Sequence, residues 1–217
     1  MTIRILARAA AALSLLLLAA CASIVDKPVR PTLFDMGPLP PITPPIERSG
    51  QRFALVVPEI DAAGALEGSA ILYRLGYSDD HQLRAYSQSR WSAPPPQLVR
   101  QRLRQQLGRE RPVLNLDESA SLAREAAQPL YLLRMELEEF AHVFDEPASS
   151  RGVIRLRATL FLSTTAGEKL VGQRSIAVQG VAPSQDASGG VRALTEATDA
   201  AASDISEWLV QVARTRP

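Results

Sequence analysis

The position of the only cysteine divides this chain into a leader and a part that can fold. The first eight residues carry two arginines and no acidic residue, Ala9–Leu18 is apolar apart from one serine, and two alanines precede Cys21. Positive, apolar and small segments in this order are typical of a secretory signal. The apolar run is too short to span a bilayer, which takes about 20 apolar residues. We therefore expect residues 1–20 to be a signal peptide that contributes nothing to the fold.

The four residues Leu18-Ala19-Ala20-Cys21 resemble a bacterial lipobox. In that motif the cysteine thiol receives a diacylglyceryl group, the peptide is cut before the cysteine and the new amine is acylated. The alternative is an ordinary signal peptide followed by an incidental cysteine. The lipobox is favoured because the only cysteine lies where the motif requires it, so we expect lipidation of Cys21. Several acyl chains hold more firmly than one, since each buried CH₂ contributes about 0.8 kcal/mol.

The residue after the cysteine bears on the destination of the protein. Ala22 resembles the pattern that passes a lipoprotein to the outer membrane, whereas Asp at this position retains it in the inner membrane. We expect a lipid anchor in the outer membrane, on its periplasmic face.

A proline-rich segment follows the anchor. Seven of the 18 residues from Pro28 to Pro45 are proline, which favours extended polyproline II over a helix or a central strand. We expect a lipidated tether over residues 21–50, with a fully extended reach of roughly 90 Å. Two readings stay open: a spacer, or an arm that folds back on its own domain. The side chains available for such docking are Leu33, Phe34 and Met36.

Residues 51–214 are expected to form one domain, which their number suits. Of 24 basic residues two lie in the leader, so 22 face 23 acidic ones. A near-neutral balance argues against nucleic acid as a partner, because phosphates require a concentrated basic field. One cysteine excludes an intramolecular disulfide and a cysteine-based zinc cluster, and two histidines leave little material for another metal site. We expect no metal and no cofactor.

Hydrophobic periodicity predicts an α+β fold. In Arg151–Ser163 apolar residues alternate with arginines and threonine, which indicates a half-buried antiparallel strand. The consecutive Glu138 and Glu139 suggest a bulge, and acids on one strand facing arginines on the next suggest ion pairs on the wet face. The prediction is a layered sandwich: a mixed, mainly antiparallel sheet with helices packed on it. The expected strands are Phe53–Pro58, Ala70–Leu75, Gln82–Trp91, Pro112–Leu116, Leu130–Phe144, Arg151–Ser163 and Leu170–Val181, and the expected helices are Pro94–Leu107, Asp117–Gln128 and Val191–Val212.

The chemistry-bearing residues favour structural roles. His81 lies in a predicted turn beside two aspartates, and His142 is expected to be an outward or half-buried structural residue of a strand. Glu136 and Glu138 are expected to pair with arginines on the surface. Gly189-Gly190 lacks the residues of a phosphate loop and is interpreted as a flexible entry to the last helix. We therefore predict no catalytic residues and no enzyme, and an envelope hydrolase is poorly supported.

Three groups of segments carry a family resemblance. The segments are Tyr73-Arg74 with Leu83–Pro95; Leu137–Phe140 with Phe144-Asp145 and Arg155–Ala158; and Gly189–Val191 with Ala197-Thr198 and Trp208-Leu209. Together they are similar to the ABC-type transport auxiliary lipoprotein family, which includes the lipoprotein of the paraquat-inducible (Pqi) intermembrane transport system. The similarity covers about residues 50–212 behind the lipobox.

The resemblance implies a non-catalytic component of an MCE-type transport system. Such lipoproteins partner a periplasmic MCE-domain protein and, through it, an inner-membrane ABC permease and ATPase, moving phospholipid or other hydrophobic molecules between membranes. The alternative is a periplasmic lipid-binding carrier with its own cavity, and a homo-oligomeric ring is left open. Among the residues in the matching segments, aromatic and arginine side chains are the types enriched at interfaces, so the partner-binding candidates are Tyr73, Tyr86, Arg90 and Trp91. For Trp91 a place in the core is favoured over the interface.

Overall fold

The computed structural model describes residues 30–39, 53–115, 130–164 and 166–214. The predicted signal peptide, the lipidation site Cys21 and the predicted helix Asp117–Gln128 lie outside these residues. From Thr32 onward the chain forms one compact unit, and the description below concerns this unit.

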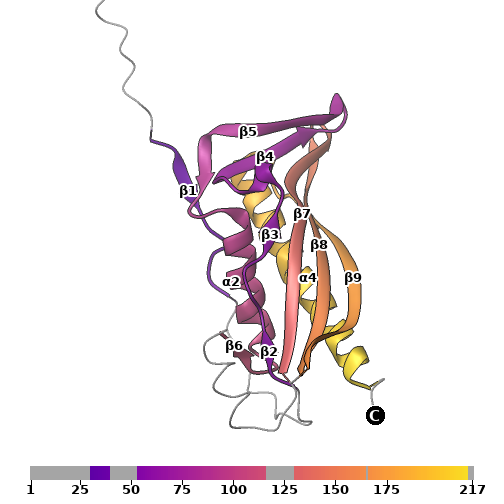
Figure 1. The fold of residues 1–217 in the computed structure, drawn as a ribbon. Helices are drawn as coiled ribbons and strands as arrows, with labels where there is room; N and C mark the ends of the chain where they lie inside the picture. Colours follow the sequence, from indigo (N-terminus) through magenta and orange to yellow (C-terminus); the bar gives the residue numbers. More distant parts are fainter. Residues whose placement is uncertain (1–29, 40–52, 116–129, 165, 215–217) are drawn as a thin grey trace, which may run out of the picture. The chain divides into compact units, whose positions relative to one another are not determined.

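Three long antiparallel strands form the largest part of the sheet (Figure 1). They are β7 (Leu130–Glu146), β8 (Ser149–Thr164) and β9 (Gly167–Val181). Strand β8 pairs with β7 on one side and β9 on the other. The three predicted strands are confirmed, each extended by a few residues, because the turns between them are shorter than expected.

The second edge of β7 takes three short partners in succession. Strands β2, β3 and β4 pair with it in parallel, at Tyr131–Leu132, Glu136–Leu137 and His142–Phe144 respectively. Strand β5 then pairs antiparallel to β4 and parallel to β1, while β6 pairs parallel to β2. The nine strands of the described residues therefore form one mixed sheet. The remaining bounds are β1 (Thr32–Phe34), β2 (Leu55–Val56), β3 (Asp61–Ala62), the 3₁₀ turn η2 (Gly64–Leu66), β4 (Ala70–Leu75), β5 (Asp79–Trp91) and β6 (Val113–Leu114).

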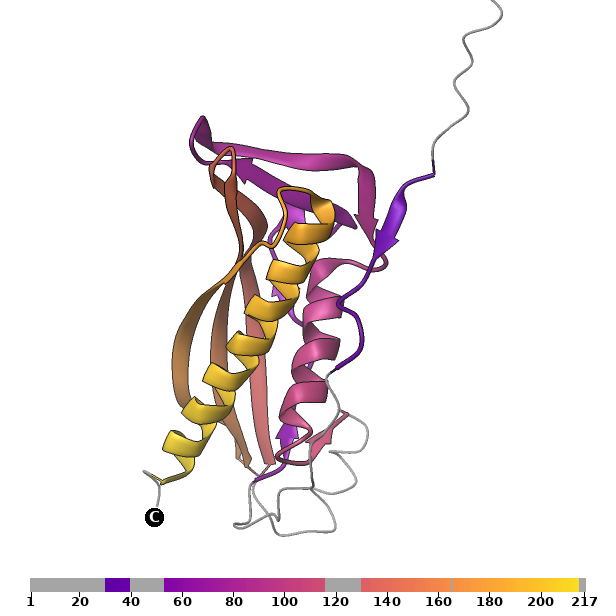
Figure 2. The same ribbon diagram turned by 180° about the vertical axis from the view of Figure 1, so that it is seen from behind.

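In the described residues two helices accompany this sheet, and Figure 2 shows them on one side of it. Helix α2 (Pro95–Leu107) opens on prolines, which the first helical turn tolerates because its N–H groups have no helical partner. It ends at Gly108, whose N–H donates to the Arg104 carbonyl at 2.9 Å. Helix α4 (Ala187–Arg214) is longer than predicted and packs along β7, β8 and β9. The predicted α+β class is confirmed.

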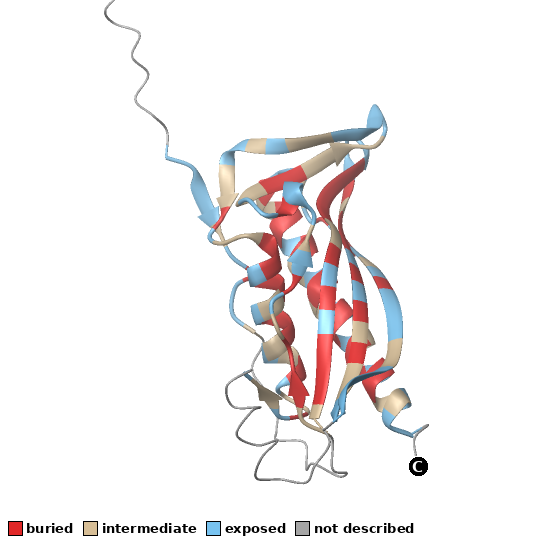
Figure 3. Ribbon diagram, viewed as in Figure 1, coloured by how far each residue is buried: buried red, intermediate tan, exposed pale blue. Residues whose placement is uncertain are grey.

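The core lies between the helices and the inner face of the sheet (Figure 3). Alternate residues of β8 point inward and are fully buried, namely Ile154, Leu156, Ala158 and Leu160. They meet buried residues of α4 such as Leu194, Ile205 and Leu209. Burying each large apolar side chain contributes about 1.5–3 kcal/mol, so this layer is the main source of stability.

Glycines set how closely α4 approaches the sheet. A Cβ at Gly152 would lie 2.5 Å from the Leu194 backbone nitrogen, and one at Gly180 would lie 2.4 Å from the Ala193 carbonyl oxygen. A Cβ at Gly190 would likewise lie 2.5 Å from Nδ1 of the His142 ring. The interpretation of Gly189-Gly190 as a flexible entry is wrong, because both are buried inside the first turn of α4. They are needed for close packing.

The opposite face of the sheet carries the predicted ion pairs. Arg157 pairs with Glu136 at 3.3 Å and also with Glu138, while Arg155 pairs with Glu139 at 3.3 Å. The register shifts between Leu137 and Glu139, so the bulge is confirmed. It lets both Glu136 and Glu138 reach Arg157.

These exposed ion pairs are expected to contribute little to the stability of the fold. The Arg157 side chain is 48% exposed, so water screens its attraction to the carboxylates. We expect Arg157→Ala to lower the free energy of unfolding by no more than about 1 kcal/mol. Urea unfolding at low and high salt measures this. A loss several times larger would show that the pairs hold the bulge in place.

Candidate functional site

An N-terminal segment, residues 32–39, lies against the domain and is called the strap below. Its β1 part pairs with the end of β5, with Leu33 opposite Arg90, and the Ser92 N–H donates to the Phe34 carbonyl at 2.7 Å. Met36 is buried, Phe34 packs partly against the core and Leu33 is 66% exposed. Residues 32–39 therefore fold back on the domain, as the second interpretation of the tether expected, and Leu33 points away from the core.

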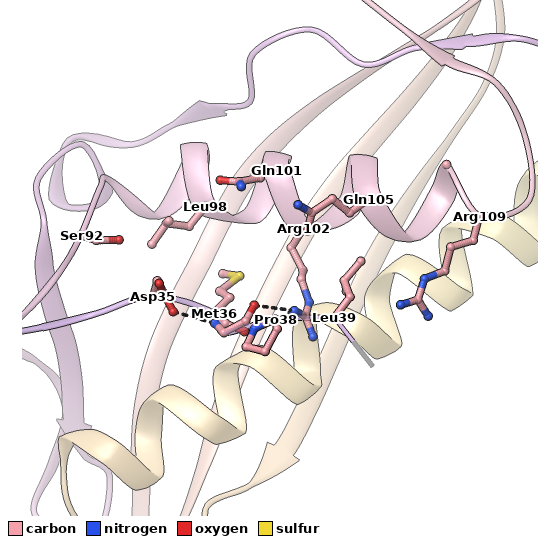
Figure 4. A pocket seen from close by; sticks show the side chains of 12 residues that line it. Asp35, Met36, Pro38, Leu39, Ser92, Leu98, Gln101, Arg102, Gln105 and Arg109 are labelled. Carbon is pink, nitrogen blue, oxygen red and sulfur yellow. Dashed lines mark hydrogen bonds between the residues drawn. The ribbon is translucent and has the colours of Figure 1, made fainter. Parts of the chain in front are cut away.

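Arg102 of α2 joins the strap to both helices. Figure 4 shows its side chain reaching from α2 to the strap. Its guanidinium donates to both carboxylate oxygens of Asp199 on α4, at 2.6 and 2.7 Å. It also donates to the Met36 and Gly37 carbonyls, at 3.3 and 3.0 Å. Gln106 adds a bond to Asp199 at 2.9 Å. The Arg102 side chain is only 5% exposed, so it is a buried charge with a full set of partners.

The surroundings of Asp199 favour its charged form. Burial raises its pKa, but the hydrogen bonds from Arg102 and Gln106, with the nearby arginine charges, outweigh burial and hold the pKa below its usual value. The carboxylate of Asp199 reaches back to Arg102, 97 residues earlier in the chain, so no local pattern in the sequence indicates this pair.

Two hollows flank the strap. One, of about 670 Å³, lies between the strap and α2 and includes Leu98, Gln101 and Arg109. The other, of about 550 Å³, lies between the strap and α4 and includes Val191 and Thr195. Polar and apolar side chains mix in both, and both also include Met36 and Ser92.

An aromatic cluster joins β4, β5 and β7. The Tyr73 and Tyr86 rings lie 4.6 Å apart, and Tyr73 meets Phe144 edge-on at 6.1 Å. The Tyr86 hydroxyl lies 2.9 Å from His142 Nδ1. His142 is fully buried, which corrects the expectation of an outward or half-buried residue. The cause is Gly190, which brings the first turn of α4 onto the imidazole ring.

Burial also sets the charge state of this cluster. It lowers the pKa of His142 to about 4, against a smaller opposite effect of Asp186. Burial raises the pKa of Tyr86, and the charges of Tyr73 and Asp186 add to this. At neutral pH both side chains are uncharged.

A pH-dependent stability is expected from His142. Its pKa in the folded state lies below the unfolded value of 6.5, so the unfolded chain binds the extra proton first as pH falls. The stabilisation is complete above about pH 6.5 and is lost towards pH 4. We expect wild type to lose about 2–3 kcal/mol more than His142→Asn between pH 7 and 4.5, measured by urea unfolding. Parallel curves for the two proteins would contradict this.

The predicted partner-binding residues divide into core and half-buried positions. Trp91 is 1% exposed and packs against Phe140 at 5.6 Å, so the favoured core interpretation is confirmed and Trp91 offers no contact surface. Arg90 donates to the Ser89 carbonyl at 2.8 Å and to the Tyr86 carbonyl. Tyr73, Tyr86 and Arg90 are each half-buried.

His81 lies in an exposed acidic group. Its Nδ1 lies 2.8 Å from an Asp80 oxygen and 3.5 Å from an Asp79 oxygen, and its side chain is 94% exposed. In the described part of the chain this is the one cluster of three side chains of metal-ligating type, and such exposed groups commonly hold no ion. The group is exposed, but His81 does not lie in the predicted turn, because β5 begins at Asp79.

None of the helices in the described residues is long and apolar enough to cross a membrane.

Comparison with solved structures gives the fold. A Xanthomonas campestris protein of the family DUF330 superposes with a TM-score of 0.65 at 16% identity, covering 84% of this chain and 97% of that one. A second crystal structure, of an uncharacterised protein, gives 0.54 at 15% identity, covering 83% and 99%. No curated protein matches this chain.

Comparison with family models identifies the family. The model for the ABC-type transport auxiliary lipoprotein component matches residues 35–206. That range runs from the strap through the sheet and most of α4. The chain therefore belongs to the family of ABC-type transport auxiliary lipoprotein components.

Proposed function

We propose that this chain is the non-catalytic, lipid-anchored component of an MCE-type ABC transport system. It supports the outer membrane by helping to move phospholipid or other hydrophobic molecules between the inner and outer membranes. The observation that carries the proposal is the family match over residues 35–206, with a lipobox cysteine at position 21 ahead of it. Its partner is a periplasmic MCE-domain protein and, through that protein, an inner-membrane permease and ATPase.

The partner surface in this proposal lies beside the β4–β5 hairpin. Tyr73, Tyr86 and Arg90 are half-buried there, and Tyr77 at the hairpin tip is 48% exposed. A homo-oligomeric ring of this chain is a further part of the proposal. The lipid-carrier alternative gains less support, because the two hollows beside the strap include charged side chains, while apolar side chains fill the space between sheet and helices.

Lipidation of Cys21 gives the first prediction for this proposal. We expect Cys21→Ser to abolish incorporation of labelled palmitate and to prevent anchoring of the mature chain in the outer membrane. The measurement is metabolic labelling with fractionation of the envelope. Label retained by Cys21→Ser would place the acyl chains elsewhere and remove the anchor from the proposal.

Identification of the partner tests the function itself. The tagged, lipidated protein is crosslinked in the intact envelope and purified, and its partners are identified by mass spectrometry. Recovery of an MCE-domain protein supports the proposal. Recovery of another envelope assembly, with no MCE-domain protein, assigns the lipoprotein to a different machine. A deletion strain with an unaltered detergent and antibiotic barrier, in the absence of a paralogue, also counts against it.

A further inference from the structure

The strap is bound largely through its main chain. It adds three residues to the edge of β5, and its Phe34 carbonyl accepts a hydrogen bond from the Ser92 N–H. The Met36 and Gly37 carbonyls accept from Arg102. Of the strap side chains, Met36 is buried and Phe34 packs partly against the core. Carbonyl groups are common to every polypeptide, so this mode of binding suits an extended segment with apolar side chains at these two positions.

The surface beneath the strap is also wider than the strap itself. Hollows of about 670 and 550 Å³ remain on its two sides, against α2 and α4 respectively. Figure 4 shows Met36 and Leu98 beside the first of these, with Gln101, Gln105 and Arg109 farther along. The space accommodates side chains larger than those that the strap presents.

We propose that this groove, made by the edge of β5, α2 and α4, is a binding site for an extended segment of a partner protein, and that the strap occupies it in cis. The partner segment adds a strand parallel to β5, which is a recurring mode of peptide recognition. It places a side chain of methionine size in the Met36 pocket and presents two successive carbonyls to Arg102. This binding site is a property of the domain itself and does not depend on the proposed transport function.

The strap competes with any added peptide for this site, which limits the peptide binding that can be measured in the wild-type protein. A segment tethered in the same chain acts at an effective concentration on the order of millimolar, so a free peptide competes poorly with it. The site is therefore tested by releasing the strap without altering the groove. Two substitutions do this by different means. Met36→Asp puts a carboxylate in an apolar pocket, and Gly37→Val strains a residue at φ +62° that has open space around its Cα.

The probe is a fluorescent peptide with the sequence of residues 31–39, added to the full-length lipidated protein in detergent. We expect it to bind Met36→Asp and Gly37→Val at least tenfold more tightly than wild type. Leu33→Ala is the matched control, because this side chain is exposed, and it should bind the peptide as wild type does. A second peptide carrying Met36→Asp should bind none of the proteins. Hydrogen exchange should show the Ser92 amide unprotected in the opened variants and protected again when the peptide is bound.

Other outcomes overturn the inference. Circular dichroism first establishes that both opened variants keep the wild-type fold, and the two substitutions act independently, so one remains informative if the other unfolds. Absence of peptide binding to a folded, opened variant means that the groove does not accept a segment in trans. Equal binding to wild type and to the opened variants, or binding that leaves the Ser92 amide unprotected, means that the peptide binds elsewhere.

Discussion

Replacement of Arg102 by methionine is expected to lower the free energy of unfolding by about 3 kcal/mol. The substitution leaves the Asp199 carboxylate with only Gln106 as a hydrogen-bond donor among its described partners and removes both bonds to the strap. Breaking a buried pair from one side costs about 3–5 kcal/mol, because the remaining charge is desolvated and uncompensated. Asp199 is 28% exposed, so the lower part of this range applies.

The control is the same substitution at Arg155. Arg155 also pairs with a carboxylate, Glu139, but its side chain is 52% exposed, and its loss should cost no more than about 1 kcal/mol. Urea unfolding at pH 7 compares the two variants. Equal losses would mean that the Arg102 pair is no stronger than a surface pair, and that main-chain hydrogen bonds and apolar contacts hold the strap and the helices in place.

The Arg102 network also predicts a dependence on pH. The pKa of Asp199 is lower in the folded protein than in the unfolded chain, so its contribution is present above the unfolded value near 4. It is lost as pH falls through the folded value. The Arg102→Met variant should therefore differ most from wild type at neutral pH, and the difference should shrink in acid.

Substitution of Gly152 by alanine is the second change with a large expected effect. It should lower the free energy of unfolding by about 3 kcal/mol or more. The added Cβ would lie 2.5 Å from the Leu194 nitrogen and 2.6 Å from the Ala193 carbonyl carbon. Both are helix backbone atoms, so no side-chain rotation relieves the contact and α4 itself must move away from β8. That movement opens space along the core that Leu194 and Ala197 now fill.

Gly172→Ala in β9 is the matched control. Its added Cβ would meet only Trp208 Cζ2, at 3.5 Å, which is ordinary contact. This variant should be neutral or slightly stabilised, because alanine loses less backbone entropy on folding. Thermal unfolding of both variants is the measurement. A Gly152→Ala protein as stable as Gly172→Ala would show that α4 shifts at little cost.

Local patterns predicted most of the fold. The alternation in Arg151–Ser163 placed β8 within two residues, and the Pro94 run with Gly108 bounded α2. These features depend on a period or a turn within a few residues. The parallel pairing of β2, β3 and β4 with β7 has no such local signal, because each strand finds its partner across more than 60 residues of chain.

The candidate site was harder to predict for the same reason. Arg102 resembled the other arginines of α2, and nothing near it in the sequence indicated Asp199 or the Met36 carbonyl as a partner. The close contacts of α4 left a weak signal. Gly152 and Gly180 of the sheet face an alanine-rich helix, and Gly190 of that helix faces the sheet, which indicates close backbone approach. The burial of His142 follows from the close approach of α4 to the sheet, so it was not predicted either.

If Cys21 carries the proposed acyl chains, the docked strap shortens the link between the domain and the membrane. With acyl chains on Cys21, 30 residues of free tether would give a contour length of roughly 90 Å. Since the chain is committed to the domain from Thr32, only the 11 residues Cys21–Pro31 remain, with a contour length of about 34 Å. In the proposed exchange, release of the strap would lengthen this link again. A partner segment in the groove would then let the domain lie farther from the membrane surface.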